Sequence, residues 1–290
     1  MTDATPTLMR RRLGAELRTM RIRAGLSLAQ AVKLLGISGS PSLSKIENGK
    51  LRANLDKFLS VYGIEDEARI AELRKLEKLA EANRRKGLFT QYGDVIHDSL
   101  ADLIELEDLA SQADAYAAMT VPDLLQTRDY ACAVIESSCA WYTARQERTF
   151  AELRMKRQQV LVQRRSGDAS VPPLMMRCVL DEACLRRRVG AAGVLREQLK
   201  RVLDASEMPN VEVRVIPFAA GAHTSVSGAY TVFHFDEGQP VVAIEPLTTS
   251  FYLEEDTHTV RYDTAFNYLR EQALDIATSR DFINRLLKEA

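Results

Sequence analysis

Hydrophobic positions recur with helical spacing over residues 1–64, and glycines separate the helical runs. Leu13, Leu17 and Met20 stand four and then three residues apart, so they share one face of a helix that begins near Met9. Glycines and good capping residues mark the ends of three shorter segments that follow. The pattern predicts helices over residues 9–24, 28–35, 41–47 and 54–62.

The second and third of these helices have the arrangement of a helix-turn-helix. A turn rich in glycine and serine joins them, and Ser40 is expected to cap the third helix. In that helix Leu43 and Ile46 lie three residues apart and can be buried on one side. The short polar and basic residues left on the other side are Ser42, Ser44 and Lys45.

The rest of the chain predicts a helical region followed by a part with strands. Residues 65–86 form one expected helix, which is either a short coiled-coil seam or a fifth helix packed on the N-terminal domain. Residues 95–163 have mostly helical patterning, with Glu105, Glu107 and Asp108 outside an apolar stripe. The charged helix over 143–163 is interpreted as a solvated or salt-bridged face, although its arginines also suit a second basic site.

Strand signals begin only after residue 171. Residues 211–217 alternate between apolar and polar positions, and a turn joins 228–235 to 241–244, which predicts a hairpin. Segments 174–180 and 253–260 add further strands, and helices over 193–206, 262–277 and 279–288 complete the pattern. The expected fold class is therefore mainly α with an α+β C-terminal part, whose sheet is small and mostly antiparallel.

The formal net charge of −1 separates these parts when it is divided along the chain. Residues 1–64 hold 11 lysines and arginines against 4 aspartates and glutamates, a net charge of +7. Residues 65–90 carry +1 and residues 91–290 carry −9. A basic head on an acidic body indicates a nucleic-acid partner for the head. We expect a helix-turn-helix domain over 1–64, a helical linker over 65–90 and a regulatory or partner-binding domain over 91–290.

Double-stranded DNA is the partner expected for the basic head. Short side chains let helix 41–47 enter the major groove, where Lys45 can reach a guanine or a phosphate. Flanking cations would neutralise phosphates, the interaction that dominates affinity and weakens with salt. Those cations are Arg10, Arg18, Arg21, Arg23, Lys50 and Arg52. A helix-turn-helix that makes only protein contacts is the alternative, and it would leave the +7 charge without a role.

Several motifs in this head resemble the Xre/Cro/phage-repressor helix-turn-helix family. They are Gly25-Leu26-Ser27, Gly36-Ile37-Ser38 and Leu43-Ser44-Lys45-Ile46-Glu47-Asn48-Gly49-Lys50. The resemblance implies that Arg21 pairs with Glu47 and that peptide N–H groups near Asn48 hold a phosphate. It also implies that Ser40 faces the bases together with Ser42, Ser44 and Lys45, and Ser27 joins the expected phosphate contacts. The turn is one residue longer than in the family, so which serines read bases stays open.

The body resembles the C-terminal domain of a large actinobacterial regulator family called antitoxin-like or WhiJ-like. The motifs are Leu106-Glu107-Asp108-Leu109-Ala110, residues 121–131, Asp181-Glu182-Ala183-Cys184-Leu185-Arg186-Arg187 and residues 211–217. Asp123 stands where the family prefers glycine. The resemblance implies control through a small partner protein encoded nearby.

Known catalytic and metal-binding motifs are missing from the sequence. The four cysteines form no Cys-x-x-Cys pair, and the four histidines have no metal-ligand spacing. We therefore expect no enzyme, metal or cofactor. Three residues could converge on an effector pocket or, as the weaker alternative, on an acyl-transfer site. They are His223, His234 and Glu245.

The sequence thus predicts a DNA-binding transcriptional regulator whose body responds to a partner protein or ligand. The alternative is an antitoxin-like protein that mainly sequesters a small partner, with DNA binding serving autoregulation. A homodimer is expected because one helix-turn-helix contacts few bases. No run approaches about 18 apolar residues and no secretion signal is recognisable, so we expect a cytoplasmic protein, nucleoid-associated when bound to DNA, without a membrane partner.

Overall fold

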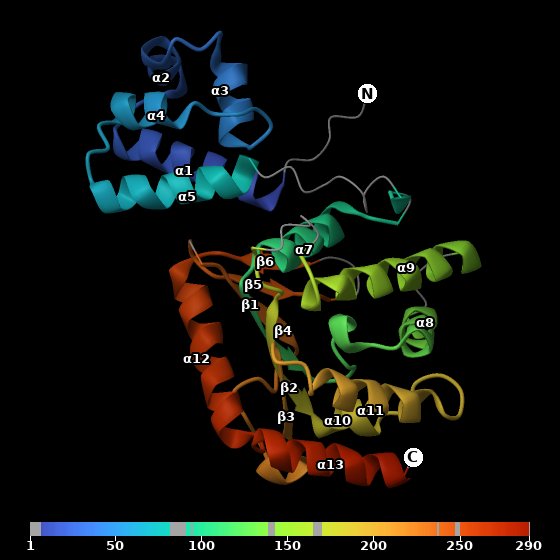
Figure 1. Ribbon diagram of the computed structural model, residues 1–290. Coiled ribbons are helices and arrows are strands. Elements are labelled where there is room, and N and C mark those ends of the chain that lie inside the picture. The colour runs from blue at the N-terminus through green and yellow to red at the C-terminus, as the bar shows by residue number, and fades with distance from the viewer. Residues whose placement is uncertain are drawn as a thin grey trace. The chain divides into compact units, whose positions relative to one another are not determined.

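The computed structural model divides the chain into two compact units, Met1–Lys86 and Gly87–Ala290 (Figure 1). The structure describes residues 7–81, 91–93, 95–138, 143–164, 170–236, 238–246 and 250–289. Cys139 and the expected end of helix 65–86 lie outside these residues. In the described part, no helix is long and apolar enough to cross a membrane.

Five helices make up the described part of the N-terminal unit. They are α1 (Leu8–Arg23), α2 (Leu28–Leu35), α3 (Ser40–Glu47), α4 (Leu55–Tyr62) and α5 (Glu67–Glu81). Local chemistry explains their ends: Ser27 and Gln30 form a capping box on α2, and Gly36 takes the left-handed conformation with φ of 59° after it. Asn54 caps α4 through its side chain. The four helices expected over residues 1–64 are present.

The start of α3 differs from the expectation, and the packing of α5 decides between two interpretations. Ser40 is the first residue of α3, and Gly39 stands at the N-cap position without a side-chain bond. Helix α5 packs against α1, where Arg69 forms an ion pair with Glu16 and Arg10 Nε donates to the carbonyl of Ala80 at 3.1 Å. Of the two interpretations of residues 65–86, the structure therefore shows the fifth helix of the N-terminal unit.

Helix α1 approaches the end of α3 so closely that only glycine fits between them. A Cβ atom on Gly14 would lie 2.6 Å from the carbonyl oxygen of Glu47 and 2.7 Å from that of Ile46. Gly49, which follows α3, has φ of +72°, and a Cβ atom there would lie 2.7 Å from the backbone of Arg10 in α1. The two glycines therefore fix the position of α3 on α1.

The C-terminal unit is built around one six-stranded mixed sheet in the order β3-β2-β1-β4-β5-β6. The strands are β1 (Gln112–Ala117), β2 (Met175–Asp181), β3 (Val211–Ile216), β4 (Tyr230–His234), β5 (Val241–Ile244) and β6 (Phe251–Leu253). Strands β1, β2 and β3 are parallel, and β4, β5 and β6 continue the sheet in antiparallel pairs. The α+β class is confirmed, but the sheet is larger than the small, mostly antiparallel one expected.

Helices surround this sheet and connect its strands. They are α7 (Asp98–Leu109), α8 (Arg128–Ser137), α9 (Ala144–Arg157), α10 (Glu182–Arg186), α11 (Val194–Ala205), α12 (Asp256–Gln272) and α13 (Ile276–Glu289). Short 3-10 turns η1 (Asp123–Leu125), η2 (Gln158–Leu161) and η3 (Phe218–Ala220) join some of them. Figure 1 shows α12 along one side of the sheet and α7 and α9 on the other.

One hydrophobic core lies between α12 and the sheet. Phe266 and Leu269 of α12 pack on Tyr116, Val179 and residues from the neighbouring strands, all of them buried. The order of side chains along each strand decides which residues join this core, because alternate residues point to opposite faces. On β1, Asp114 and Tyr116 therefore face α12, whereas Ala113, Ala115 and Ala117 face the other way.

Helix α7 is buried on all sides, contrary to the expectation of an acidic outer face. Asp102, Glu105, Glu107 and Asp108 are each no more than 3% exposed. Buried arginines explain part of this, since Arg157 binds the Glu107 carboxylate and Arg164 donates to the carbonyls of residues 107 and 108. Glu107 was misassigned because its basic partner, Arg157, comes from a distant part of the chain.

Candidate nucleic-acid interface and C-terminal pocket

Helix α3 presents a small, mostly polar surface. Lys45 is exposed and makes no hydrogen bond or ion pair within the described residues, while Ser40, Ser42 and Ser44 are half-buried. The Ser42 hydroxyl lies 2.9 Å from that of Ser38 in the preceding turn. Leu43 is fully buried and Ile46 nearly so, which places the serines and Lys45 on the other side of the helix, as the sequence predicted.

Arg21 and Glu47 form the internal ion pair that the resemblance implied. Arg21 Nε donates to Glu47 Oε1 at 2.6 Å and Nη2 donates to Oε2 at 3.1 Å, and both side chains are less than one-tenth exposed. A third donor, Nη1, bonds the carbonyl of Leu26 at 2.9 Å. Burial alone would lower the pKa of Arg21, but the hydrogen bond to Glu47 outweighs it and raises the pKa. The phosphate contact also expected of Arg21 does not fit this buried position.

The turn after α3 uses its peptide groups internally. The N–H groups of residues 48–51 donate to the carbonyls of Ser44, Lys45 and Ile46. The Asn48 side chain donates to the carbonyl of Ser44 at 2.7 Å. These groups close the helix, so the anion-binding N–H groups expected near Asn48 are already occupied in this structure.

The remaining residues expected at phosphates fall into two groups. Arg18, Arg23 and Lys50 are exposed and form no ion pair within the described residues, as a contact to DNA requires. The others have partners inside the unit: Arg10 is tied to α5, Ser27 caps α2, and Arg52 lies 4.0 Å from Glu81.

In the C-terminal unit, the three residues expected in one pocket lie apart. His234 is on the α12 side of the sheet, where its Nε2 is 3.0 Å from Asp114 Oδ2 and 3.6 Å from Asp263 Oδ1. His223 contacts the hydroxyl of Tyr116 at 3.3 Å on that side. Glu245 follows β5 and lines a pocket against the opposite face. The acyl-transfer grouping is therefore not assembled, because the sheet separates its members.

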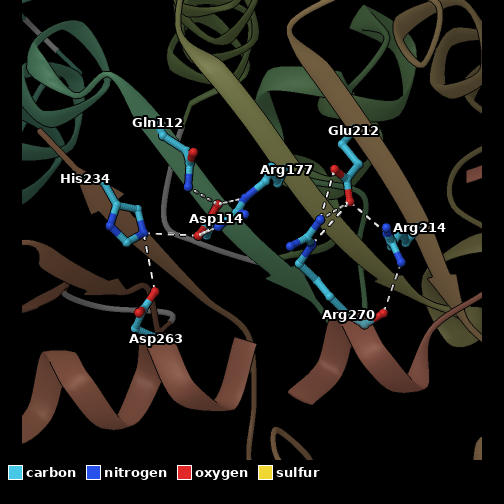
Figure 2. Close-up of polar contacts among 8 residues, drawn as sticks. All are labelled: Gln112, Asp114, Arg177, Glu212, Arg214, His234, Asp263 and Arg270. Carbon is cyan, nitrogen blue, oxygen red and sulfur yellow. Dashed lines mark hydrogen bonds and ion pairs between the residues drawn. The ribbon is translucent and has the colours of Figure 1, made fainter. Parts of the chain in front are cut away.

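Figure 2 shows the polar network that holds His234. Asp114 is completely buried; both its oxygens accept from Arg177, Gln112 donates to Oδ1 at 3.0 Å, and His234 lies against Oδ2. Burial alone would raise the pKa of Asp114, but the hydrogen bonds from His234 and Arg177 lower it overall. Asp114, His234 and Asp263 could approach one metal ion, yet Arg177 already supplies the positive charge that the buried carboxylate needs.

The pocket on the opposite face has a volume of about 520 Å³. Its floor consists of small side chains of the sheet, and its wall holds a charged cluster from α7, η1 and α9. Arg157 binds Glu107 with bonds of 3.0 and 2.7 Å and Asp123 at 3.1 Å. Although burial acts to lower it, these carboxylates raise the pKa of Arg157. Arg154 also binds Asp123, at 3.0 Å.

Two protein-family models match the chain, one in each unit. Residues 12–73 match a family described as a helix-turn-helix domain, and the match covers most of α1, all of α2 to α4 and part of α5. Residues 100–285 match the domain of unknown function DUF5753, which covers more than half of the chain.

The chain belongs to the DUF5753 family. No curated protein and no solved structure matches it. The match to DUF5753 spans all six strands and both faces of the sheet, so the pocket and the network around Asp114 are parts of this domain.

Sequence reasoning missed most of the charged residues that line the pocket. Arg154 and Arg157 belonged to a helix interpreted as a solvated or salt-bridged face, and the structure shows the salt-bridged form for these two residues. Glu107 was assigned to solvent. One signal was available: Asp123 departs from the glycine that the resemblance led us to expect, and it is the residue that joins both arginines. Glu245 was expected in a pocket, but with partners from the wrong side of the sheet.

Proposed function

We propose that this DUF5753 protein is a sequence-specific, Xre-type DNA-binding regulator of transcription whose C-terminal domain responds to a ligand or partner protein. The observation that carries the proposal is Lys45 on α3, which is exposed and has no ion pair among the described residues. It belongs to a helix-turn-helix unit that has a strongly positive net charge. The protein acts in the cytoplasm, as a homodimer that binds two half-sites about one helical turn, roughly 34 Å, apart.

Physical reasons support α3 as the element that reads DNA. A helix enters the major groove only when the side chains on its outer face are short or flexible, and α3 offers half-buried serines beside one long cation. Arg21, Glu47 and the close contact at Gly14 hold α3 rigidly on α1. A rigid helix loses little conformational entropy when it binds, so more of the contact energy contributes to affinity.

Lys45→Ala tests the assignment. If Lys45 contacts a base, the variant should lose about 1–3 kcal/mol of binding free energy at one position of the operator and keep its non-specific affinity. The operator is first selected from a random DNA pool with the full chain, and binding is then measured by mobility shift over a salt series. Lys78→Ala, an exposed lysine on α5, is the matched control and should bind like the wild type.

Two results would count against the proposal. The first is failure of the full chain to select any sequence from the pool. The second is a Lys45→Ala variant that retains the full discrimination of the wild type. A variant that loses affinity equally on all sequences, with a salt slope smaller by about 1, would instead assign Lys45 to a phosphate.

The resemblance to WhiJ-like regulators adds the expectation of a small partner protein for the C-terminal domain. Addition of the purified product of a neighbouring gene should then change the mobility of the protein–DNA complex. A neighbour that forms no complex with the full chain would leave a small-molecule ligand as the effector.

A further inference from the structure

The pocket beside Glu245 has the size and lining of a small-molecule site. Its volume of about 520 Å³ lies within the range of typical ligand pockets, roughly 300–1,000 Å³. The sheet provides a floor of small side chains, since Ala115 pairs with Thr231 and Thr231 pairs with Ala243 across three strands. Larger residues at these positions would fill the space, as they do on the α12 side of the same strands.

Both arginines in the pocket wall are already paired with carboxylates of the wall. Arg157 is only 4% exposed and divides its donors between Glu107 and Asp123. Arg154 is 18% exposed and bonds Asp123 and the side-chain oxygen of Gln126. An anionic ligand would have to compete with Glu107 and Asp123 for these guanidinium groups and would add to the negative charge of the wall.

Glu245 is the charged lining residue that has no hydrogen bond or ion pair within the described residues. The Glu245 residue is exposed to solvent, but the protein atoms around its carboxylate reduce the solvation of that group. This desolvation, with the nearby negative charges of Asp123 and Glu107, raises the pKa of Glu245 to about 7, against the opposing effect of the two arginines. The charged and titratable groups around it are Glu107, Asp123, Arg154, Arg157 and Tyr252.

We propose that this pocket binds a small organic cation, an amine or guanidine carried on an apolar group, with Glu245 as its counter-ion. The cation would supply the one positive charge that the wall lacks, because three carboxylates face two guanidinium groups there. The apolar group would rest on the alanine floor of β1 and against Phe233. The proposal rests on the proposed function, since it names the ligand class of the domain that responds to an effector.

Matched probes on the full chain test the charge and the apolar body separately. Phenethylamine and benzylguanidine carry the cation, phenethyl alcohol is a neutral counterpart and phenylacetate is an anionic one. Ligands that bind the folded state raise its melting temperature, so thermal shifts at equal probe concentrations rank the four compounds. At least one cation should raise the melting temperature, and the neutral and anionic probes should not.

Glu245→Gln should remove the preference for the cations while the circular dichroism spectrum stays unchanged. Glu271→Gln, an exposed carboxylate on α12 that does not line the pocket, should behave like the wild type. Calorimetric titration should also show that cation binding weakens by about tenfold per pH unit below pH 7 in the wild type, because Glu245 must then lose a proton on binding. Glu245→Gln should lack this dependence.

The proposal fails if neither cation shifts the melting temperature, if phenylacetate or the alcohol binds as well as the cations, or if Glu245→Gln binds them normally. Mobility shift on the selected operator is measured in parallel without any probe. DNA binding that persists when the probes fail would overturn the pocket assignment alone. Cation binding in a chain that selects no DNA would overturn the proposed regulator instead.

Discussion

Gly14→Ala sets helix propensity against steric exclusion at one position, and the structure decides which effect is larger. Alanine in the middle of a helix is favoured over glycine by about 1 kcal/mol, so local propensity alone predicts a more stable α1. The added Cβ would lie 2.6 Å from the carbonyl oxygen of Glu47, whereas ordinary contacts begin at 3.4 Å. The obstacle is backbone, so α3 must move away from α1 by about 0.8 Å.

Displacement of α3 also disturbs the buried pair between Arg21 and Glu47. Overpacking of this kind costs up to about 3 kcal/mol, against a gain in propensity of about 1 kcal/mol, so the net loss is up to roughly 2 kcal/mol. Native-state hydrogen exchange on the full chain measures this loss for the N-terminal unit by itself, through the protection of amides in α1 and α3. Operator affinity should fall too, because Lys45 moves with α3.

Thr19→Ala is the matched control for Gly14→Ala. Thr19 is exposed on the same helix, so the variant gains propensity without a steric conflict and should be slightly more stable than the wild type. Greater protection of α1 amides in Gly14→Ala than in the wild type would refute the steric argument.

Two further predictions concern buried charges. Arg21→Met should destabilise the N-terminal unit by about 3–5 kcal/mol in urea denaturation, because it leaves the Glu47 carboxylate buried without its partner. The added change Glu47→Leu should recover most of this loss. A double variant no more stable than Arg21→Met would contradict the reasoning. In the C-terminal unit the pKa of Asp114 is lowered, so its stabilising effect is complete above the unfolded carboxyl pKa of about 3.9 and is lost as the pH falls towards the lower folded value. Asp114→Asn should therefore be less stable at neutral pH and show a shallower loss of stability below about pH 4, whereas an acid limb equal to that of the wild type would contradict the role of the network.

The N-terminal helices were predictable because their ends depend on residues close in sequence. The Ser27–Gln30 capping box, the left-handed Gly36 and the Asn54 cap each involve groups that are near neighbours along the chain. The pairing of Arg21 with Glu47 came from the resemblance, and the structure confirms it. The need for glycine at position 14 could not be read from local signals, since the clash comes from the backbone of a different helix, α3.

Strand β1 shows where local patterning fails in the C-terminal domain. Its sequence, Gln-Ala-Asp-Ala-Tyr-Ala, contains three alanines, which rank low in strand preference, and it follows a helix directly. It nevertheless occupies the middle of the sheet, between β2 and β4. Its parallel pairing with β2, a strand much later in the chain, cannot be seen in a pattern with a period of two. The larger, mixed sheet follows from this one strand.

By itself, the sequence determined the helix-turn-helix, the division of charge between the two units and the side of α3 that stays exposed. These properties depend on helical periodicity, caps and composition, all of which act over short distances. Only the tertiary structure decided that α7 buries its acids and that the sheet separates His234 from Glu245. Whether a charged side chain is buried or exposed depends on the partner that folding brings to it, and such partners come from distant parts of the chain.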